Sequence, residues 1–186
     1  MSDLSIARSR AIGLNPHVLG LTIFPTEKCN FRCLYCYETF PNIRMSDAVA
    51  SALTKLIFNR RSDLDALSIR WFGGEPLLEA SRVIELSTFA KKVAVENDID
   101  FWSGITTNGF LLTYPLFVNL LEAGICHFQV SLDGMKTEHD ATRRGHTDRG
   151  TFDRIIRNLL DFRLESWRRL FGQRPAGFKW IPAGLC

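Results

Sequence analysis

The 186-residue sequence has no apolar run close to the roughly 20 residues that a membrane-spanning helix needs. Residues 1–16 lack the long apolar centre of a secretory signal. An even set of cysteines, which a disulfide framework favours, is also missing, because the chain contains five. From these absences we expect a soluble, cytoplasmic protein without a membrane partner, in which clustered cysteines more often hold a metal than form disulfides.

A strong excess of charge of one sign is absent as well, since the formal net charge is +3. The positive charge gathers in residues 143–186, which hold ten Lys and Arg against four Asp and Glu. Such a segment could attract nucleic acid, but Arg on the solvent face of a helix is the commoner explanation. Because 46% of the residues are hydrophobic, we expect a folded globular domain and no nucleic-acid partner.

The residues that are present alternate between strand-like and helix-like patterns. Strands are predicted over 18–26, 66–74, 100–109 and 125–134. The four helical stretches between and after them carry apolar stripes, which are Val49, Leu53, Leu56 and Ile57 after a Ser46 cap, then Val83 to Val93, then the stretch from Thr113 to Gly124, and finally Phe152 to Leu160. This order is typical of an α/β fold with parallel strands joined by helical crossovers. We expect a lead-in over 1–17, one core domain over 18–165 and an irregular tail over 166–186, in which 178–182 could form a short strand.

Three of the cysteines gather in the stretch CNFRCLYCYE, as Cys29, Cys33 and Cys36. Three thiolates at this C-x3-C-x2-C spacing can hold three irons of a [4Fe–4S] cluster and leave the fourth iron open to a small molecule. A structural zinc site is an alternative, but it needs a fourth ligand. Three buried cysteines without a metal are another. We expect Cys126 to be a buried strand residue and Cys186 an incidental terminal thiol.

Other polar motifs follow the predicted strands, at the ends where α/β proteins carry their chemistry. Gly73, Gly74 and Glu75 come directly after the second strand, where glycines let a ligand approach the backbone and a carboxylate can receive an ammonium group. Ser131 follows the fourth strand. Arg143 could form a forked pair with a carboxylate or be a solvated cation at a helix end.

Together these motifs resemble the radical S-adenosylmethionine (SAM) superfamily over residues 18–165. The cysteines match its cluster motif, with Tyr35 before the last cysteine, and residues 73–76 match its GGEP motif. The stretches TTNG (106–109), VSLDG (130–134) and HDATR (139–143) look most like the branch of anaerobic sulfatase maturases and other peptide-modifying, SPASM-type enzymes. The resemblance implies an incomplete parallel (β/α) barrel, of which about four β/α units are recognisable here.

The resemblance also implies a mechanism. SAM chelates the open iron, the reduced cluster gives one electron to the sulfonium, and the resulting 5′-deoxyadenosyl radical abstracts a substrate hydrogen. Its site residues would be Cys29, Cys33 and Cys36 for iron, Tyr35 beside the adenine, Glu75 with the backbone of Gly73 and Gly74 for the amino group, and Ser131 and Arg143 for the carboxylate or the ribose. For Asn108 and Asp133 a functional role and a plain turn role are equally open. The implied partners are a peptide or protein substrate and an electron donor such as flavodoxin or ferredoxin.

The sequence departs from the family pattern toward its C-terminal end. Further strands, and the extension whose cysteines hold auxiliary clusters, are not recognisable, and no catalytic acid or base is assigned. A catalytically inactive, truncated fragment of such an enzyme is therefore one alternative. A small zinc-binding module is another.

Overall fold

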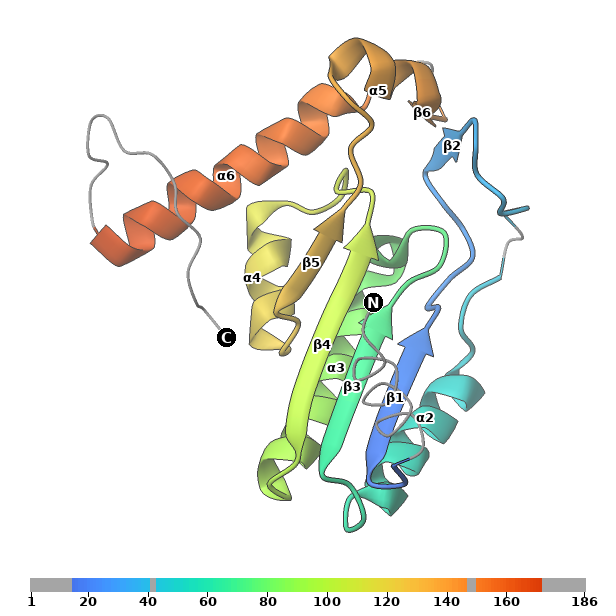
Figure 1. The fold of residues 1–186 in the computed structure, drawn as a ribbon, viewed down its shortest axis with the longest axis vertical. Coiled ribbons are helices and arrows are strands. Elements are labelled where there is room, and N and C mark those ends of the chain that lie inside the picture. Colours follow the sequence, from blue (N-terminus) through green and yellow to red (C-terminus); the bar gives the residue numbers. More distant parts are fainter. Residues whose placement is uncertain (1–14, 41–42, 147–149, 172–186) are drawn as a thin grey trace, which may run out of the picture.

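The computed structural model describes residues 15–40, 43–146 and 150–171. Its centre is a four-stranded parallel sheet in the order β1-β3-β4-β5, in which each new strand adds beside the previous one (Figure 1). The strands are β1 (Val18–Ile23), β3 (Ala66–Trp71), β4 (Asp100–Thr107) and β5 (His127–Val130). All four strand predictions are confirmed, with shorter C-terminal ends because the motif residues leave the sheet and form loops.

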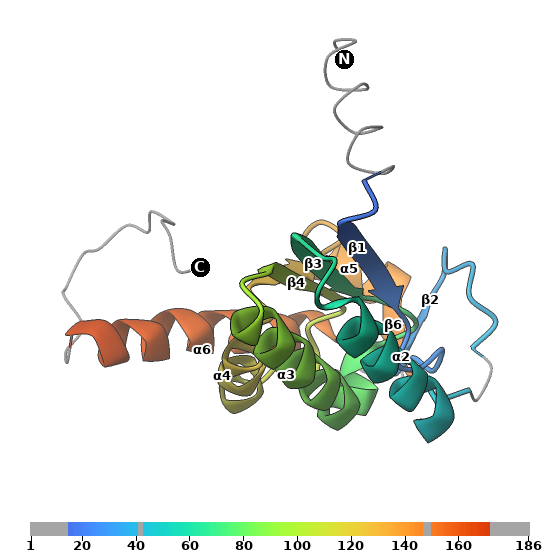
Figure 2. The ribbon, with the colours of Figure 1, turned by 90° about the horizontal axis from the view of Figure 1, so that it is seen from below.

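Helices connect the strands of the sheet, and two more follow its last strand. They are α2 (Asp47–Arg60), η1 (Pro76–Glu79), α3 (Ala80–Glu96), α4 (Tyr114–Glu122), α5 (Lys136–Thr142) and α6 (Phe152–Phe171). Figure 2 shows α2, α3 and α4 together on the same side of the strands. Crossover helices on one side of a parallel sheet are the arrangement of a β/α barrel, whereas a doubly wound sheet has helices on both faces.

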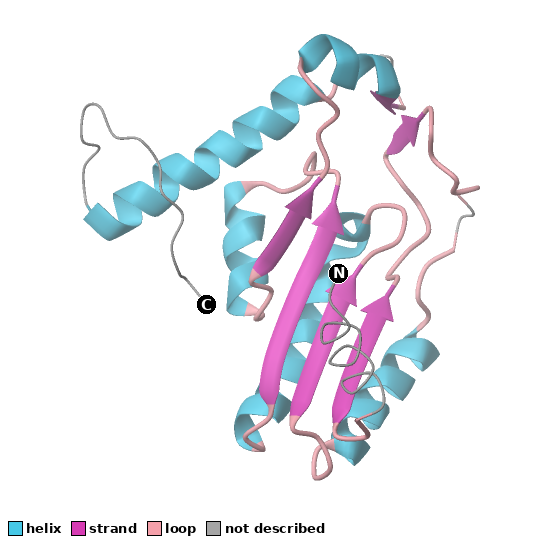
Figure 3. Cartoon of the chain, in the orientation of Figure 1, coloured by secondary structure: helices cyan, strands magenta, loops and turns pink. Residues whose placement is uncertain are grey.

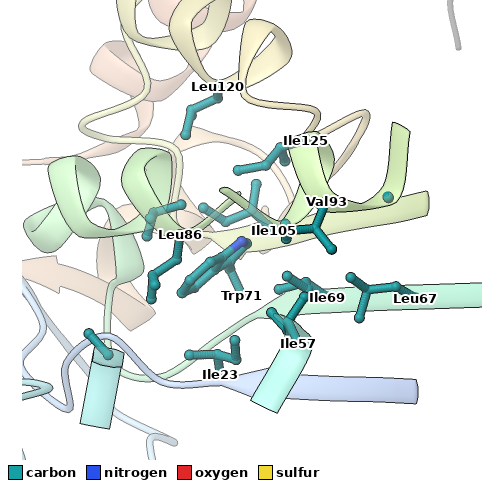
Figure 4. Packing of buried hydrophobic residues seen from close by; sticks show 14 of the residues in the cluster. Ile23, Ile57, Leu67, Ile69, Trp71, Leu86, Val93, Ile105, Leu120 and Ile125 are labelled. Atoms are coloured by element: carbon teal, nitrogen blue, oxygen red, sulfur yellow. The ribbon is translucent and has the colours of Figure 1, made fainter. Parts of the chain in front are cut away.

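The core lies between the sheet and these helices (Figure 4). Leu67, Ile69 and Trp71 alternate along β3 and are almost fully buried, as the two-residue period of a strand requires. The predicted stripe of α3, from Val83 to Val93, packs against them. Trp71 donates a hydrogen bond from Nε1 to the buried Ser87 Oγ at 2.9 Å, which satisfies the one polar atom of its ring.

The helix caps follow the sequence closely. The Ser46 side chain accepts from the Val49 amide at the start of α2. Gly124 ends α4 with φ of 95°, and the amides of Gly124 and Ile125 donate to the carbonyls of Leu121 and Leu120. These two bonds form a Schellman motif, which explains why glycine stands at this position.

Three expectations were wrong. In α2 the buried residues are Ala50 and Ile57, while Val49 and Leu56 are exposed, because the helix turns its small Ala50 toward the sheet. Residues 166–171 are not irregular but continue α6 to Phe171. Cys126 is exposed, because Ile125 before it takes the core-facing position and adjacent side chains point to opposite sides. The remaining tail, 172–186, with its expected strand and Cys186, lies outside the described residues.

A second, two-stranded sheet was not predicted. β2 (Phe31–Cys33) and β6 (Arg143–Gly145) pair antiparallel beyond the C-terminal ends of β1 and β5, at the top of Figure 3. Each strand has three residues, too few for a two-residue hydrophobic period to be visible. This ribbon ties the cysteine segment to a part of the chain more than 100 residues away.

Among the helices of the described part of the chain, none is both long and apolar enough to cross a bilayer.

Candidate functional site

The cysteine loop, residues 29–36, lies at the C-terminal edge of the sheet and is held by the β2–β6 ribbon. Cys33 stands directly opposite Arg143 in the ribbon. The Leu34 amide donates to the Thr142 carbonyl at 2.9 Å, and a ring nitrogen of His146 lies 3.2 Å from the Cys29 carbonyl oxygen. The loop therefore takes its shape from distant segments as well as from its own sequence.

All three cysteine side chains of the loop are half-buried. Burial raises the pKa of Cys29 to about 11, although the Phe31 amide, which donates to its sulfur at 3.3 Å, acts in the opposite direction. Burial also raises the pKa of Cys33, and the positive charge of Arg143 offsets part of that rise. The thiols of Cys29 and Cys33 are therefore protonated at neutral pH, and metal binding must release these protons.

The arrangement of the thiols bears on the zinc alternative. Within residues 15–40, 43–146 and 150–171, no three His, Cys, Asp or Glu side chains are gathered closely enough to hold one metal ion. A single zinc needs its ligands within about 2.3 Å of one point. A [4Fe–4S] cluster binds each thiolate through a different iron, so its ligands stand further apart.

Glu75 lies on the GGEP loop, residues 73–76, and its side chain is fully buried, with 0% exposed. Oε1 accepts from the Leu77 amide at 3.0 Å and from the Thr107 hydroxyl at 2.7 Å. Oε2 accepts from the Asn108 amide at 2.8 Å. Burial raises the pKa of Glu75, and these three hydrogen bonds counteract the rise. The carboxylate thus joins the GGEP loop to the end of β4, and its contact with the SAM amino group stays a prediction.

Gly73 and Gly74 lie against the segment that leads into the cysteine loop. A Cβ on Gly74 would stand 2.3 Å from the Lys28 carbonyl oxygen, and one on Gly73 would stand 2.4 Å from that of Thr26. Gly73 also has φ of 114°, where L residues are strained. We expected glycine here for the approach of a ligand. The structure shows that the close approach is by the chain's own backbone.

Arg143 is 8% exposed and lies at the centre of a polar group formed with Tyr35 and Asp133. Its Nη1 donates to the Tyr35 hydroxyl at 2.6 Å and lies 3.8 Å from Asp133 Oδ1. Burial raises the pKa of Asp133, but hydrogen bonds from Tyr35 and Thr142 and the charge of Arg143 outweigh it and lower the pKa below its usual value. The buried Nε of Arg143 has no hydrogen-bond partner among the described residues. It can therefore serve an anionic ligand.

Two further predicted residues follow strand ends. Ser131 comes directly after β5 and is half-buried, and none of the interactions among the described residues joins it to Arg143 or Tyr35. Tyr35 is 58% exposed, so its ring is open to solvent while its hydroxyl is held. The structure brings Tyr35 and Arg143 together and leaves Ser131 as a separate prediction.

His139 of α5 was missed by the sequence reasoning. Its ring is fully buried, accepts from the Asp133 amide at Nδ1 (3.3 Å) and lies 3.1 Å from Thr151 Oγ1 at Nε2. Since the Thr151 hydroxyl donates to the Arg143 carbonyl at 2.8 Å, it must accept from His139, which places the proton on Nε2. Burial and the charge of Arg143 lower the pKa of His139. Neutral His139 thus fixes the backbone around Arg143; the signal was its place in the HDATR motif.

Comparison with known proteins decides the family. The model of the radical SAM superfamily matches residues 23–172. The chain belongs to the radical SAM superfamily. This radical SAM chain is 38% identical over 116 residues to a GTP 3′,8-cyclase of Campylobacter jejuni, with 61% of this chain and 34% of the relative covered. It is 27% identical over 134 residues to Fe-coproporphyrin III synthase of Methanosarcina barkeri, with 72% and 31% covered.

The solved structure of native anSMEcpe, an anaerobic sulfatase maturase, with bound AdoMet and Kp18Cys peptide is similar to this radical SAM chain, with a TM-score of 0.67 and 25% identity. The match covers 78% of this chain and 40% of that one. The four-stranded sheet and its helices therefore correspond to part of the radical SAM partial barrel. The chain spans about a third of the length of the curated relatives and two fifths of the maturase chain.

The family implies a [4Fe–4S] cluster and SAM, and the residues of this radical SAM chain fit both. Three thiols on one loop supply the donor set of a cluster with one open iron. Arg143 pairs with Cys33 in the ribbon, and its buried Nε, which has no hydrogen-bond partner among the described residues, would supply a cation for the carboxylate of SAM.

Proposed function

We propose that Cys29, Cys33 and Cys36 bind a [4Fe–4S] cluster, that SAM binds at the same edge of the sheet, and that the protein is a radical SAM enzyme modifying a peptide or protein. The observation that carries this proposal is the pairing of Cys33 with Arg143. It joins the metal-binding loop to a buried cation with an unused hydrogen-bond donor.

Each polar group of the site has a defined task in this proposal. When bound, the cluster and SAM supply a 5′-deoxyadenosyl radical, which abstracts a hydrogen atom from the substrate. Arg143 would hold the SAM carboxylate, and the exposed ring of Tyr35 would pack beside the adenine. Glu75, with the backbone of Gly73 and Gly74, would receive the amino group. Ser131 would bind on the carboxylate or ribose side.

A peptide or protein substrate is supported by the branch resemblance of residues 130–143 and by the likeness to a maturase solved with a bound peptide. The curated relatives carry other names, which include a GTP cyclase, so the substrate class needs a direct comparison. We propose flavodoxin or ferredoxin as the electron donor, and dithionite can replace it in vitro.

The test is anaerobic reconstitution of the full chain, followed by iron and sulfide analysis and by measurement of 5′-deoxyadenosine after addition of SAM and dithionite. We expect about four irons per chain and SAM cleavage, both lost when the three cysteines of the loop are replaced by alanine. Cys126→Ala, which changes an exposed cysteine outside the loop, is the matched control and should retain both. One zinc per chain, or folded protein that takes up no cluster, would contradict the proposal.

A second experiment tests the substrate class. Cysteine-containing peptides and GTP are each incubated with reconstituted protein, SAM and reductant. A change in peptide mass in proportion to the 5′-deoxyadenosine formed supports peptide modification. Conversion of GTP alone would refute it.

A further inference from the structure

Asn108 directly follows β4 in the TNG loop, residues 107–109, and is only 6% exposed. Its Oδ1 accepts from the Phe110 amide at 3.0 Å. Because a backbone amide can only donate, this bond fixes which end of the Asn108 side chain is the oxygen. The other end, Nδ2, must then point away from Phe110.

The Nδ2 of Asn108 points at the cysteine loop. It donates to Asn30 Oδ1 at 2.8 Å and lies 3.9 Å from Cys29 Sγ, within reach of a hydrogen bond to sulfur. An NH₂ group has two hydrogens, so one can serve the Asn30 oxygen and the other the sulfur. These contacts link residues almost 80 positions apart.

The backbone of Asn108 is held as firmly as its side chain, because its amide donates to the fully buried carboxylate of Glu75 at 2.8 Å. The side-chain amide of Asn108, which carries Nδ2, therefore has a fixed position relative to Cys29. An Asn-Gly turn explains the Oδ1 bond to Phe110 but gives no reason for Nδ2 to face a cysteine.

We infer that Asn108 is a positioning residue for the cluster, which directs an N–H at the sulfur of Cys29 and so favours the reduced state. The physical reason is that reduction adds negative charge to the cluster and its thiolates, and a donor to sulfur stabilises the more negative state. The bond to Asn30 keeps the amide in place beside that sulfur. The inference rests on the proposed function, since it requires the cluster to be bound by Cys29.

The test is the midpoint potential of the reconstituted cluster, followed by electron paramagnetic resonance during a redox titration. Asn108→Ser keeps an oxygen that can accept from the Phe110 amide and adds no charge, but it removes the donor that reaches Cys29. We expect the reduction equilibrium to shift about tenfold toward the oxidised state, which equals about 59 mV for a one-electron couple. Asn108→Ala is a second neutral variant, with the same expectation, for the case that the serine variant does not fold.

Two controls separate the hydrogen bond from a general disturbance of the loop. Asn158 donates from Nδ2 to the carbonyls of Gly109 and Phe110, at 2.9 and 3.0 Å, so Asn158→Ser disturbs the same loop but leaves the Asn108 donor in place. It should leave the potential unchanged. Asn30→Ser removes the anchor but not the donor, and its shift should be smaller than that of Asn108→Ser.

A potential equal to wild type in both Asn108 variants would overturn the inference, and so would an equal shift in Asn158→Ser or Asn30→Ser. Iron and sulfide contents separate this failure from failure of the proposed function. Wild-type protein that takes up no cluster overturns both, whereas full clusters with unchanged potentials overturn the inference alone.

Discussion

Replacing Glu75 by alanine should destabilise the protein even when no cofactor is bound. The carboxylate is fully buried and accepts from the amides of Leu77 and Asn108 and from the hydroxyl of Thr107. Alanine leaves these donors inside the protein without an acceptor. If Glu75 served only to bind SAM, the apoprotein would lose nothing by the change.

The size of the effect follows from the two backbone amides that lose their acceptor. The Thr107 hydroxyl is left out because it can rotate toward another acceptor. An unsatisfied buried donor costs about 1–3 kcal/mol, so the two together cost roughly 2–6 kcal/mol. Removing a buried negative charge, whose desolvation raises the pKa of Glu75, offsets part of this cost. We expect a loss of about 3 kcal/mol. Glu75→Gln keeps one oxygen and leaves one backbone amide without an acceptor, so the free energy of unfolding should fall by about 1–2 kcal/mol.

The assay is urea denaturation of the apoprotein, monitored by circular dichroism and analysed by linear extrapolation. Glu85→Ala is the matched control, because Glu85 is exposed and its carboxylate pairs with the nearby Arg82 on α3. A free energy of unfolding for Glu75→Ala within about 0.5 kcal/mol of wild type would refute the reasoning, because ordinary surface substitutions stay within that range.

Three other predictions concern the surroundings of the site. Gly74→Ala should lower the free energy of unfolding by about 1–3 kcal/mol, because its Cβ overlaps the backbone entering the cysteine loop, whereas Gly20→Ala, with 3.4 Å of room, should fall well short of that in the same urea titration. The stability of the wild type should fall as pH drops below about 6.5, because the unfolded chain then binds a proton that folded His139, with its lowered pKa, does not. The fall should be shallower in His139→Gln. Equal slopes of the free energy of unfolding against pH in wild type and variant would contradict this prediction. Arg143→Lys should weaken SAM binding to the reconstituted protein about tenfold in equilibrium dialysis, while the exposed Arg144→Lys should not.

The sheet was predictable because its information is local. Each strand has a short apolar run ended by glycine or by a polar motif, and α3 shows its stripe directly. The motif residues were predictable as a group, since parallel strands bring their C-terminal ends to one edge. The pairing of Tyr35 with Arg143 at that edge agrees with this reasoning.

The contacts of each motif residue were less predictable, because they depend on which loops lie next to one another in the folded chain. The inward turn of Glu75 is set by donors at the end of β4 and directly after it, 32 and 33 residues away, and no pattern within the GGEP motif shows it. The three-residue strands of the ribbon are too short to show a period. The face of α2 was misread because Ala50 is small, so that the larger Val49 gave the stronger apolar signal while lying exposed.

The ribbon that clamps the cysteine loop has a consequence for the order of events during synthesis. Arg143 follows Tyr35 by 108 positions, so at a ribosomal rate of about 5–20 residues per second the loop waits about 5–20 s for its partner strand. During that interval the three thiols belong to a segment that has not yet paired with β6. Delivery of iron and sulfide to a correctly shaped loop must therefore come after residue 145 has been added. Conditions that slow translation lengthen the time in which these thiols are open to oxidation.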